Sequence, residues 1–271
     1  METELQVPLP VPLPLPRLRS GWPVFDELGL IEPGRVTLVD VGAEQGQRLL
    51  CRLLADAVAT RGEAIVLDGG NWLDAYRLGD AAEAAGHSRA RTLESVRVAR
   101  GFTAYQLQSL AEDALPALVA ERSASTGLVL VAAFPEMYMD EDMRPDESRT
   151  LAKRALDVFH RVAMDHRVPV LVSNSTLAPR TRHQLRQTLE ENVDAIVGLY
   201  PAPHEGLRIV VPSFASVLSP APGARQKLLG EFASSGTPAG DFFRRSPDAR
   251  IKDATAPRAA AAAQVRFHAR G

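Results

Sequence analysis

The sequence contains little of what secreted, membrane-spanning or disulfide-stabilised proteins require. It has a single cysteine, Cys51, which excludes an internal disulfide framework and favours a reducing compartment. The first residues, METELQ, are acidic rather than basic, which argues against a secretory signal. No apolar run is long enough to cross a bilayer. We therefore expect a cytoplasmic protein with no membrane partner.

Patterns of metal binding and nucleophilic catalysis are also missing. Six histidines occur, but they show neither metal-ligand spacing nor an HExxH motif. His160 and His166 are six residues apart, so they do not lie on adjacent turns of one helix face. Cys51 falls on the apolar side of an expected helix, where a buried and unreactive thiol is more common than a nucleophile. We expect no metal site and no catalytic residue.

Charge is nearly balanced, with a formal net charge of −2, but it is unevenly distributed. Residues 220–271 carry nine Lys/Arg and four Asp/Glu, a net charge of +5, which leaves −7 for the rest of the chain. An acidic body with a basic tail indicates either an arm for nucleic acid or a tail that lies on its own body. A solvated tail without a specific partner fits equally well.

Composition divides the chain into three parts. Residues 1–17 contain VPLPVPLPLP, which predicts a polyproline II arm because proline excludes both a helix and a central strand. Residues 18–215 form the expected core domain. Residues 216–271 are rich in Pro, Gly, Ser and Ala with scattered arginine, and we expect this basic tail to be disordered.

Short apolar runs alternate with helical patterns in the core. Continuous apolar runs are typical of parallel strands covered on both faces; they are Val36–Val41, Ala64–Asp68, Leu128–Phe134 and Val168–Ser173, with a weaker candidate in residues 91–100 and closing strands at Ala195–Leu199 and Leu207–Val211. The helical patterns lie near Gln47–Thr60, Trp72–Ala85, Ala104–Arg122 and Arg149–His166. This alternation predicts an α/β fold with right-handed crossovers.

The segment SGWPVFDELGLIEPGRVTLVDV, residues 20–41, carries a specific order of motifs. Ser20-Gly21 is followed by Phe25-Asp26-Glu27-Leu28, and Gly34-Arg35-Val36-Thr37 leads into the first core strand. This order, continued without a gap by LLCRLLADA, resembles the entry of the RecA/RadA recombinase superfamily. The resemblance covers roughly residues 18–211. It implies a RecA-like, mostly parallel β-sheet flanked by helices, in a divergent paralogue.

In the frame of this resemblance, the phosphate-binding loop Gly-x-x-x-x-Gly-Lys-Ser/Thr falls on VGAEQGQR. Gly46 matches, but Gln47 stands in place of the lysine and Arg48 in place of the hydroxyl. The loop needs the lysine charge on the phosphates and the hydroxyl on Mg²⁺. Glu44 adds a negative charge beside the phosphate position. A frame shifted by one, led by Gly42, loses the same groups.

Two further family positions are changed. The strand that would end in a Mg²⁺-organising aspartate ends in Ala132-Ala133, and after the second strand Asp68 matches while Gly70 stands in place of the water-activating glutamate. Asn174 is kept as the polar residue after the fourth core strand. The resemblance thus implies a degenerate nucleotide site without Mg²⁺-dependent ATP hydrolysis. We expect no cofactor; ATP and Mg²⁺ enter only under the alternative below.

The most basic part of the body is APRTRHQLRQ, with Arg180, Arg182, His183 and Arg186. It follows the Asn174 strand, where the resemblance places a mobile DNA-binding loop, so contact with single-stranded DNA is one interpretation. The segment lacks the aromatic residues on which bases usually stack, and the exposed start of an amphipathic helix is the other interpretation. In the tail, Arg244 and Arg245 are further candidates for phosphates or for the acidic body.

Two other stretches have a functional and a structural interpretation. In DGGN, residues 68–71, the glycines permit positive φ at the end of a strand. That indicates either a pocket with Asp68 and Asn71 or, as we favour, a tight turn in which Asn71 caps the next helix. The acidic segment EMYMDEDMRPDE, residues 136–147, is more typical of a solvated loop than of a metal site.

Three functions follow as hypotheses. The first is a non-catalytic RecA/RadA-like paralogue that assists DNA recombination or repair by binding DNA or a recombinase or other repair protein, as a homo-oligomer if the subunits assemble. The second is an ATP-binding protein with an unorthodox site in which Arg48 replaces the lysine. The third is a structural adaptor that binds neither DNA nor nucleotide.

Overall fold

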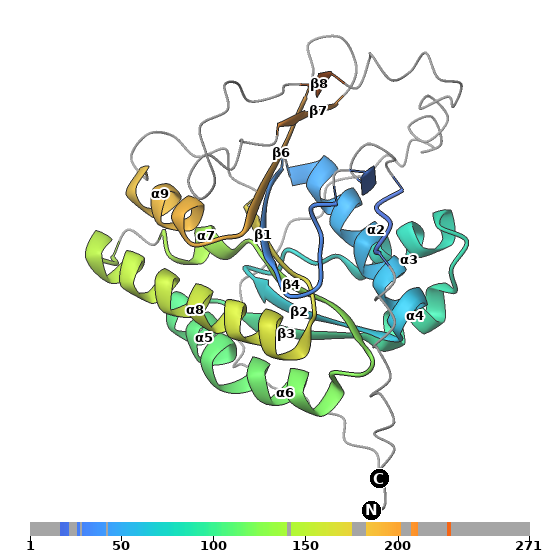
Figure 1. Cartoon of the computed structure of the whole chain (residues 1–271), viewed down its shortest axis with the longest axis horizontal. Coiled ribbons are helices and arrows are strands. Elements are labelled where there is room, and N and C mark those ends of the chain that lie inside the picture. The colour runs from blue at the N-terminus through green and yellow to red at the C-terminus, as the bar shows by residue number, and fades with distance from the viewer. Residues whose placement is uncertain are drawn as a thin grey trace, which may run out of the picture. The chain divides into compact units, whose positions relative to one another are not determined.

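The computed structural model describes residues 17–21, 26–27, 29–41, 43–139, 142–174, 183–201, 207–210 and 227–228 (Figure 1). All of these residues belong to one compact unit, Met1–Phe232. Except for Arg17, the expected N-terminal arm 1–17 lies outside the described residues. The expected tail 216–271 also lies outside them, except for Lys227 and Leu228.

One mixed sheet organises the fold. Its strands are β1 (Val36–Val41), β2 (Glu63–Gly69), β3 (Val96–Gly101), β4 (Thr126–Ala132), β5 (Val170–Asn174), β6 (Ala195–Pro201), β7 (Leu207–Val210) and β8 (Lys227–Leu228). They lie in the order β3-β2-β4-β5-β1-β6-β7-β8. The neighbouring pairs from β3 to β6 are parallel, whereas β7 and β8 add antiparallel pairs. The expected α/β class with a RecA-like, mostly parallel sheet is confirmed.

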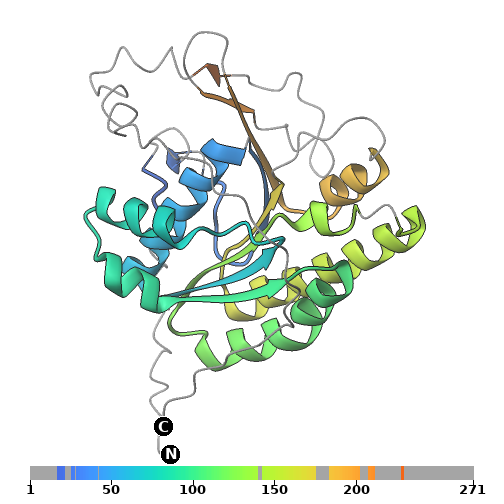
Figure 2. The ribbon, with the colours of Figure 1, turned by 180° about the vertical axis from the view of Figure 1, so that it is seen from behind.

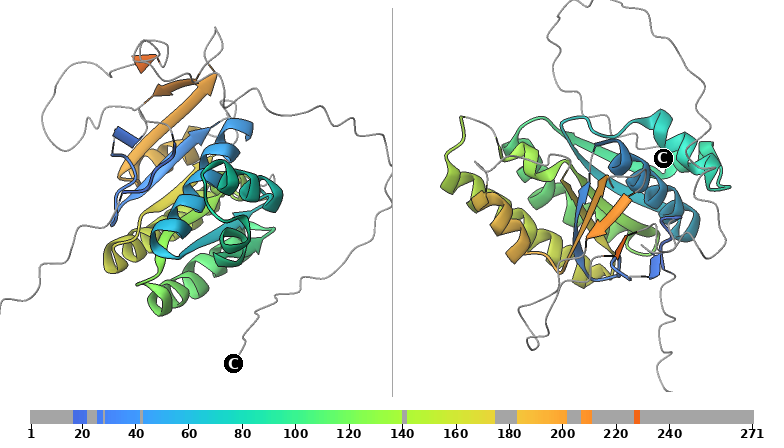
Figure 3. Two further views of the ribbon diagram at one scale, coloured as in Figure 1. Left: turned by 90° about the vertical axis from the view of Figure 1, so that its right-hand side faces the viewer. Right: turned by 90° about the horizontal axis from the view of Figure 1, so that it is seen from above.

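Helices cover both faces of this sheet. They are α2 (Ala43–Arg61), α3 (Ala75–Ala84), α4 (Arg89–Ser95), α5 (Ala104–Ser109), the π-helical segment η1 (Leu110–Ala114), α6 (Leu115–Arg122), α7 (Phe134–Met137), α8 (Pro145–His166) and α9 (His183–Glu191). Figure 2 shows α2, α3 and α4 together on one face and the later helices on the other. In Figure 3 the sheet runs between these two groups.

Alternation along the strands explains why two separate cores form. Successive strand residues point to opposite faces, so Leu38 of β1 packs with α8 residues such as Phe159, while Val39 packs with α2 residues such as Leu50. All four of these side chains are fully or almost fully buried. A continuous apolar strand is therefore needed, as the sequence indicated.

Two of the expected strands have clearly different bounds in the structure. The expected strand Leu128–Phe134 stops at Ala132 because Ala133 has φ 52° and turns the chain into α7. The weak strand candidate in residues 91–100 is helical up to Ser95, where α4 ends, and extended only from Val96.

Within the described residues, no helix combines the length and the apolar character needed to span a membrane.

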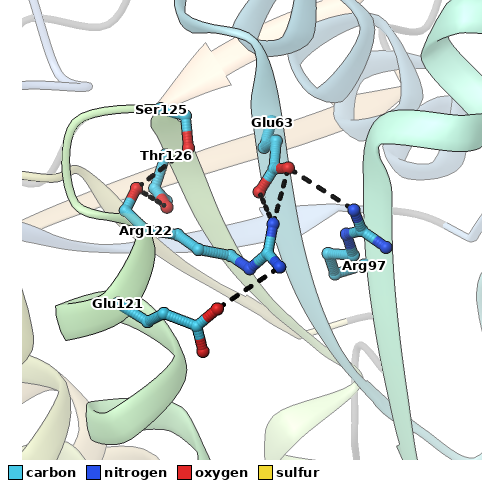
Figure 4. Close-up of polar contacts among 6 residues, drawn as sticks. All are labelled: Glu63, Arg97, Glu121, Arg122, Ser125 and Thr126. Atoms are coloured by element: carbon cyan, nitrogen blue, oxygen red, sulfur yellow. Dashed lines mark hydrogen bonds and ion pairs between the residues drawn. The ribbon is translucent and has the colours of Figure 1, made fainter. Parts of the chain in front are cut away.

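A cluster of ion pairs lies at the amino ends of β2, β3 and β4 (Figure 4). Glu63 at the start of β2 accepts from Arg122 Nη1 at 2.8 and 3.1 Å, and Arg97 of β3 approaches it at 3.5 Å. Ser125 and Thr126 donate through their hydroxyls to the carbonyl of Arg122. The end of α6 is thereby tied to the first residues of β2 and β4.

Glu63→Ala is expected to lower the free energy of unfolding by about 1 kcal/mol, because it leaves the half-buried Arg122 guanidinium without its main acceptor. Glu63→Gln keeps one acceptor oxygen and should cost about half as much. Urea unfolding followed by circular dichroism measures both. Equal stability of Glu63→Ala and the wild type would show that solvent replaces this contact at no cost.

Candidate functional site

β1 and β5 are neighbours in the sheet, but the helices that follow them lie on opposite faces: α2 follows β1 on one face, and α9 follows β5 on the other. The segments leading from β1 to β2 and from β2 to β3 contain α2, α3 and α4 on one face. Those leading from β3 through β4 and β5 to β6 contain the helices of the other face. In open α/β sheets, ligands bind at the carboxyl ends of strands where the order reverses in this way. The ends of β1 and β5 are therefore the first place to look for a site.

A buried polar network occupies these strand ends. Asp40 of β1 and Asn174 of β5 are register neighbours, and their exposed fractions are 1% and 8%. Asn174 Nδ2 donates to Asp40 Oδ1 at 2.6 Å, and Arg186 Nη1 of α9 donates to Asp40 Oδ2. A buried carboxylate needs such partners because desolvation of an unpaired charge is costly. Asn174 thus donates to a neighbouring carboxylate of its own chain.

Arg186 contributes to the protein's own structure. Besides its bond to Asp40, its Nε donates to Glu190 one turn further along α9. Burial lowers the pKa of the guanidinium, but the hydrogen bonds and the charges of Glu190 and Asp40 outweigh burial and raise it. The side chain is a permanent cation whose partners are acidic side chains of this chain. Because its guanidinium already donates to Asp40 and Glu190, Arg186 is a poor candidate for binding a DNA phosphate.

The residues expected to form a phosphate loop belong to the first turns of a helix. Only residue 42 separates the end of β1 at Val41 from the start of α2 at Ala43. Gly46 is buried within α2, Gln47 Nε2 donates to the carbonyl of Trp72 at 2.7 Å, and Arg48 is exposed. In an α-helix that begins at Ala43, the amide of Gln47 is already an internal donor. Gly42 and the side chain of Glu44 lie outside what is described.

Asp68 is fully buried at the end of β2 and serves the backbone that follows it. Its two oxygens accept from the amides of Trp72 at 2.6 Å and Leu73 at 3.2 Å, and Arg100 Nε donates to it at 3.0 Å. Arg100 also donates through Nη2 to the carbonyl of Leu73. These contacts occupy the carboxylate from three directions, so it holds the turn after β2 in place.

The turn after β2 is tightly constrained. A side chain at Gly69 would meet the carbonyl of Ala132 at 2.8 Å, and Gly70 has φ +73°. Asn71 is left-handed as well, with φ 61°. The expected capping role of Asn71 is wrong: Asp74 caps α3 and accepts from the amides of Tyr76 and Arg77. Asn71 falls in the turn that Asp68 closes, three residues before the N-cap Asp74.

A shallow hollow lies beside this turn. It has a volume of about 470 Å³ and is lined by Gln47, Asn71, Trp72, Leu73, Asp74, Ala75, Tyr76 and Arg77. Its polar lining is partly committed, because Gln47 is bonded to Trp72 and Asp74 lies 3.8 Å from Arg77 Nε. Tyr76 is 77% exposed at its rim.

Alanines occupy the position where a Mg²⁺-organising aspartate was expected, so no side-chain oxygen is available there. Ala132 ends β4, and the amide of Ala133 donates to Ser173 Oγ of β5 at 3.1 Å. Ser173 is fully buried. Its hydroxyl satisfies the backbone of the left-handed residue that turns the chain into α7. Among the described residues, no group of three or more metal-binding side chains is present.

The remaining sequence candidates fall into two groups. Arg180, Arg182, Arg244 and Arg245 lie outside the described residues. His183 is the first residue of α9, so the helical interpretation of its segment is confirmed in part, although its side chain is not described.

The acidic segment 136–147 is not simply a solvated loop. It contains the end of α7 and the start of α8, and Tyr138 is buried with its hydroxyl 2.8 Å from Gln108. Burial raises the pKa of Tyr138, and the charge of Glu112 adds to this shift. Burial likewise raises the pKa of Cys51 to about 12, with a further contribution from Asp74, as expected for an unreactive thiol.

Sequence reasoning missed the two charged residues that complete these networks, Asp40 and Arg100. Asp40 interrupts the apolar run of an expected strand, whereas Arg100 ends the weaker strand candidate, which already contains the charged Arg97. A charge inside an apolar strand is a signal of a buried pair, but its partner cannot be read from the sequence. Asp40 is 146 residues away from Arg186.

The comparisons with known proteins add no assignment. The sequence matches no model of a known protein family, and no curated protein is significantly similar to it. The fold of the chain therefore follows from its own sheet and helices, and its function has to be inferred from the chemistry at the carboxyl ends of the strands.

Proposed function

We propose that this chain is a non-catalytic RecA-like paralogue of the cytoplasm that assists DNA recombination or repair by binding DNA or a recombinase partner. The observation that carries the non-catalytic part of the proposal is the network of Asp40, Asn174 and Arg186 at the carboxyl ends of β1 and β5. In an open site of this kind, polar groups would be directed toward a ligand. Here they are directed toward each other. The part that concerns DNA or a recombinase is supported by the resemblance of residues 18–211 to RecA/RadA proteins.

The charge of the network also disfavours a nucleotide. A phosphate that entered between β1 and β5 would approach the buried carboxylate of Asp40, which repels it. Arg186 could attract the phosphate, but its charge is already paired with Asp40. Phosphate binding rewards a free cation and a backbone nest. The early start of α2 and the self-contained bonds of Asp68 argue in the same direction. A scaffold that retains the fold and acts by binding is consistent with all of these features.

Calorimetric titration with Mg·ATP tests the non-catalytic part. We expect no binding at millimolar nucleotide. Trp72 is a suitable probe because it lines the same hollow as Gln47 of the expected phosphate loop, and its fluorescence should not change. Binding that requires Mg²⁺ would contradict the proposal. Binding that disappears in Arg48→Ala would establish the unorthodox nucleotide site instead, since Arg48 is exposed on the first turns of α2.

Binding of single-stranded DNA and of a purified RecA-type recombinase at physiological salt tests the other part. Fluorescence anisotropy of a labelled oligonucleotide and calorimetry with the recombinase are suitable measurements. One of the two ligands is expected to bind. If neither does, the role in recombination is wrong and an adaptor for other proteins becomes the better explanation.

A further inference from the structure

We infer that the outer edge of β3 is a self-association surface, on which β3 of a second copy of this chain pairs in the antiparallel direction. β3 ends the strand order on one side, and among the described residues no strand lies beyond it (Figure 1). The two sheets of such a dimer join into one. The inference does not depend on the proposed function, and it would hold for a chain that binds neither DNA nor a recombinase.

The backbone of β3 directs hydrogen-bonding groups to this edge. The carbonyl of Gly101 accepts from the amide of Gly70 at 3.2 Å, so the backbone of Gly101 is directed to the side of β2. Successive residues of a strand direct their amides and carbonyls to alternate sides, which places those of Val98 and Arg100 on the outer side. The amide of Val96 agrees with this pattern, because it donates to a carbonyl of α4 and not to β2.

The usual protection of an edge strand is missing from β3. Natural edges carry a proline, a bulge or an outward charge that prevents pairing with another chain. The strand VRVARG has no proline, and its register with β2 is continuous over its whole length. Its two arginines are drawn toward β2, because Arg97 lies 3.5 Å from Glu63 and Arg100 Nε donates to Asp68 at 3.0 Å. Neither charge therefore guards the outer edge.

Val98 gives the middle of the edge an apolar surface. Its side chain is 44% exposed, whereas Val66, its register neighbour in β2, is fully buried. Phe102, directly after the strand, is 59% exposed. A β-branched side chain on a strand is stabilised by a side chain directly opposite it on a neighbouring strand. On the outer side of Val98 that neighbour is supplied by a second chain.

The charge of the edge favours a second copy over a charged partner. The charged side chains of β3 and the ion-pair partners linked to them are three arginines and three acids: Arg97, Arg100, Arg122, Glu63, Asp68 and Glu121. Their charges cancel, so two identical edges do not repel each other. A nucleic acid strand, in contrast, needs cations that are not already paired.

A two-fold axis at Val98 satisfies the edge with itself. In an antiparallel pair, residues with outward backbone groups exchange both hydrogen bonds at a Cα separation of about 5.5 Å. Val98 then pairs with Val98 of the second copy, and Arg100 pairs with Val96. Arg97 lies opposite the small Ala99, whereas a register with Arg97 opposite itself would bring like charges together. Such a contact of one patch with itself is what a symmetric dimer requires.

Analytical ultracentrifugation of the full chain between about 1 and 100 µM tests the inference. We expect a monomer–dimer equilibrium with a Kd on the order of 10 µM, since one strand pair is a small interface. Val98→Lys places two ammonium groups side by side at the axis and should weaken the dimer by about tenfold or more. Val98→Thr keeps an uncharged β-branched residue and should dimerise within about threefold of the wild type. Met164→Lys, the same kind of change at a 67% exposed site on α8, should leave the dimer unchanged.

Cysteine cross-linking tests the position of the axis. A short bis-maleimide should link Val98→Cys to a second copy and should not link Met164→Cys. The native Cys51 is fully buried and does not compete for the reagent. Urea midpoints verify that each variant folds.

Three results would overturn the inference. The first is a wild type that stays monomeric at about 100 µM, and the second is a dimer that Val98→Lys leaves unchanged. The third is a monomeric wild type that binds a recombinase through this edge, seen as a loss of that binding in Val98→Lys; the edge would then belong to a different protein. None of these results decides whether the chain binds Mg·ATP, so the non-catalytic part of the proposed function is tested separately.

Discussion

Asp68→Ala is expected to lower the free energy of unfolding by about 3 kcal/mol, the largest effect we anticipate for a polar residue of this chain. The substitution removes the acceptor of two backbone amides, those of Trp72 and Leu73, and of Arg100 Nε. Leu73 is buried, so water does not readily replace the lost acceptor there. Denaturant unfolding followed by tryptophan fluorescence and circular dichroism measures the loss.

Asp68→Asn is the matched control. Its amide has nearly the same shape but keeps only one oxygen. It should retain the closer bond from Trp72 and lose the bonds from the Leu73 amide and Arg100, which share the other oxygen. A loss of about 1–2 kcal/mol is expected. If Asp68→Ala proved as stable as the wild type, the carboxylate would not be the structural support of the turn, and a role toward an external ligand would have to be reconsidered.

Arg186→Met should be the second largest effect, with a loss of about 2 kcal/mol. It removes the Arg186 guanidinium from the buried carboxylate of Asp40. Removing one partner from a fully buried pair typically costs about 3–5 kcal/mol, but the side chain of Arg186 is 34% exposed, so solvent screening reduces the penalty. Chemical denaturation at neutral pH is the measurement.

Glu190→Gln separates the two partners of Arg186. Its carboxylate is mostly solvated, at 42% exposure, and its loss should change stability by no more than about 0.5 kcal/mol. Similar losses for Glu190→Gln and Arg186→Met would mean that the bond to Asp40 contributes little. In that case the network at β1 and β5 would not be the feature that closes the site.

Much of the fold could be predicted because its signals are local. The strand Val36–Val41 agrees with the structure at both ends, and Ala64–Asp68 is one residue short at each end. Such apolar runs identify buried strands whatever they pack against. The end of β4 was missed because nothing in AAF indicates the left-handed conformation of Ala133, which Ser173 of a different strand stabilises.

The site was only half predictable for the same reason. The absence of the lysine, hydroxyl and acids that the RecA/RadA resemblance would require could be read from the sequence. The contacts that these positions make in the structure could not. Gln47 bonds to Trp72, Asp68 to the turn after β2, and Asp40 to Arg186, and each of these pairings depends on how distant elements meet.

The short junction between β1 and α2 has a consequence for the engineering of this chain. The substitutions Gln47→Lys and Arg48→Thr would introduce the residues of the phosphate motif but not the shape of its loop. One residue between Val41 and Ala43 cannot form a loop that surrounds a phosphate. Recovery would need the first turn of α2 to unwind and Asp40 to lose its partner. Under the proposed relationship to RecA-like proteins, point mutations alone would therefore not restore a nucleotide site.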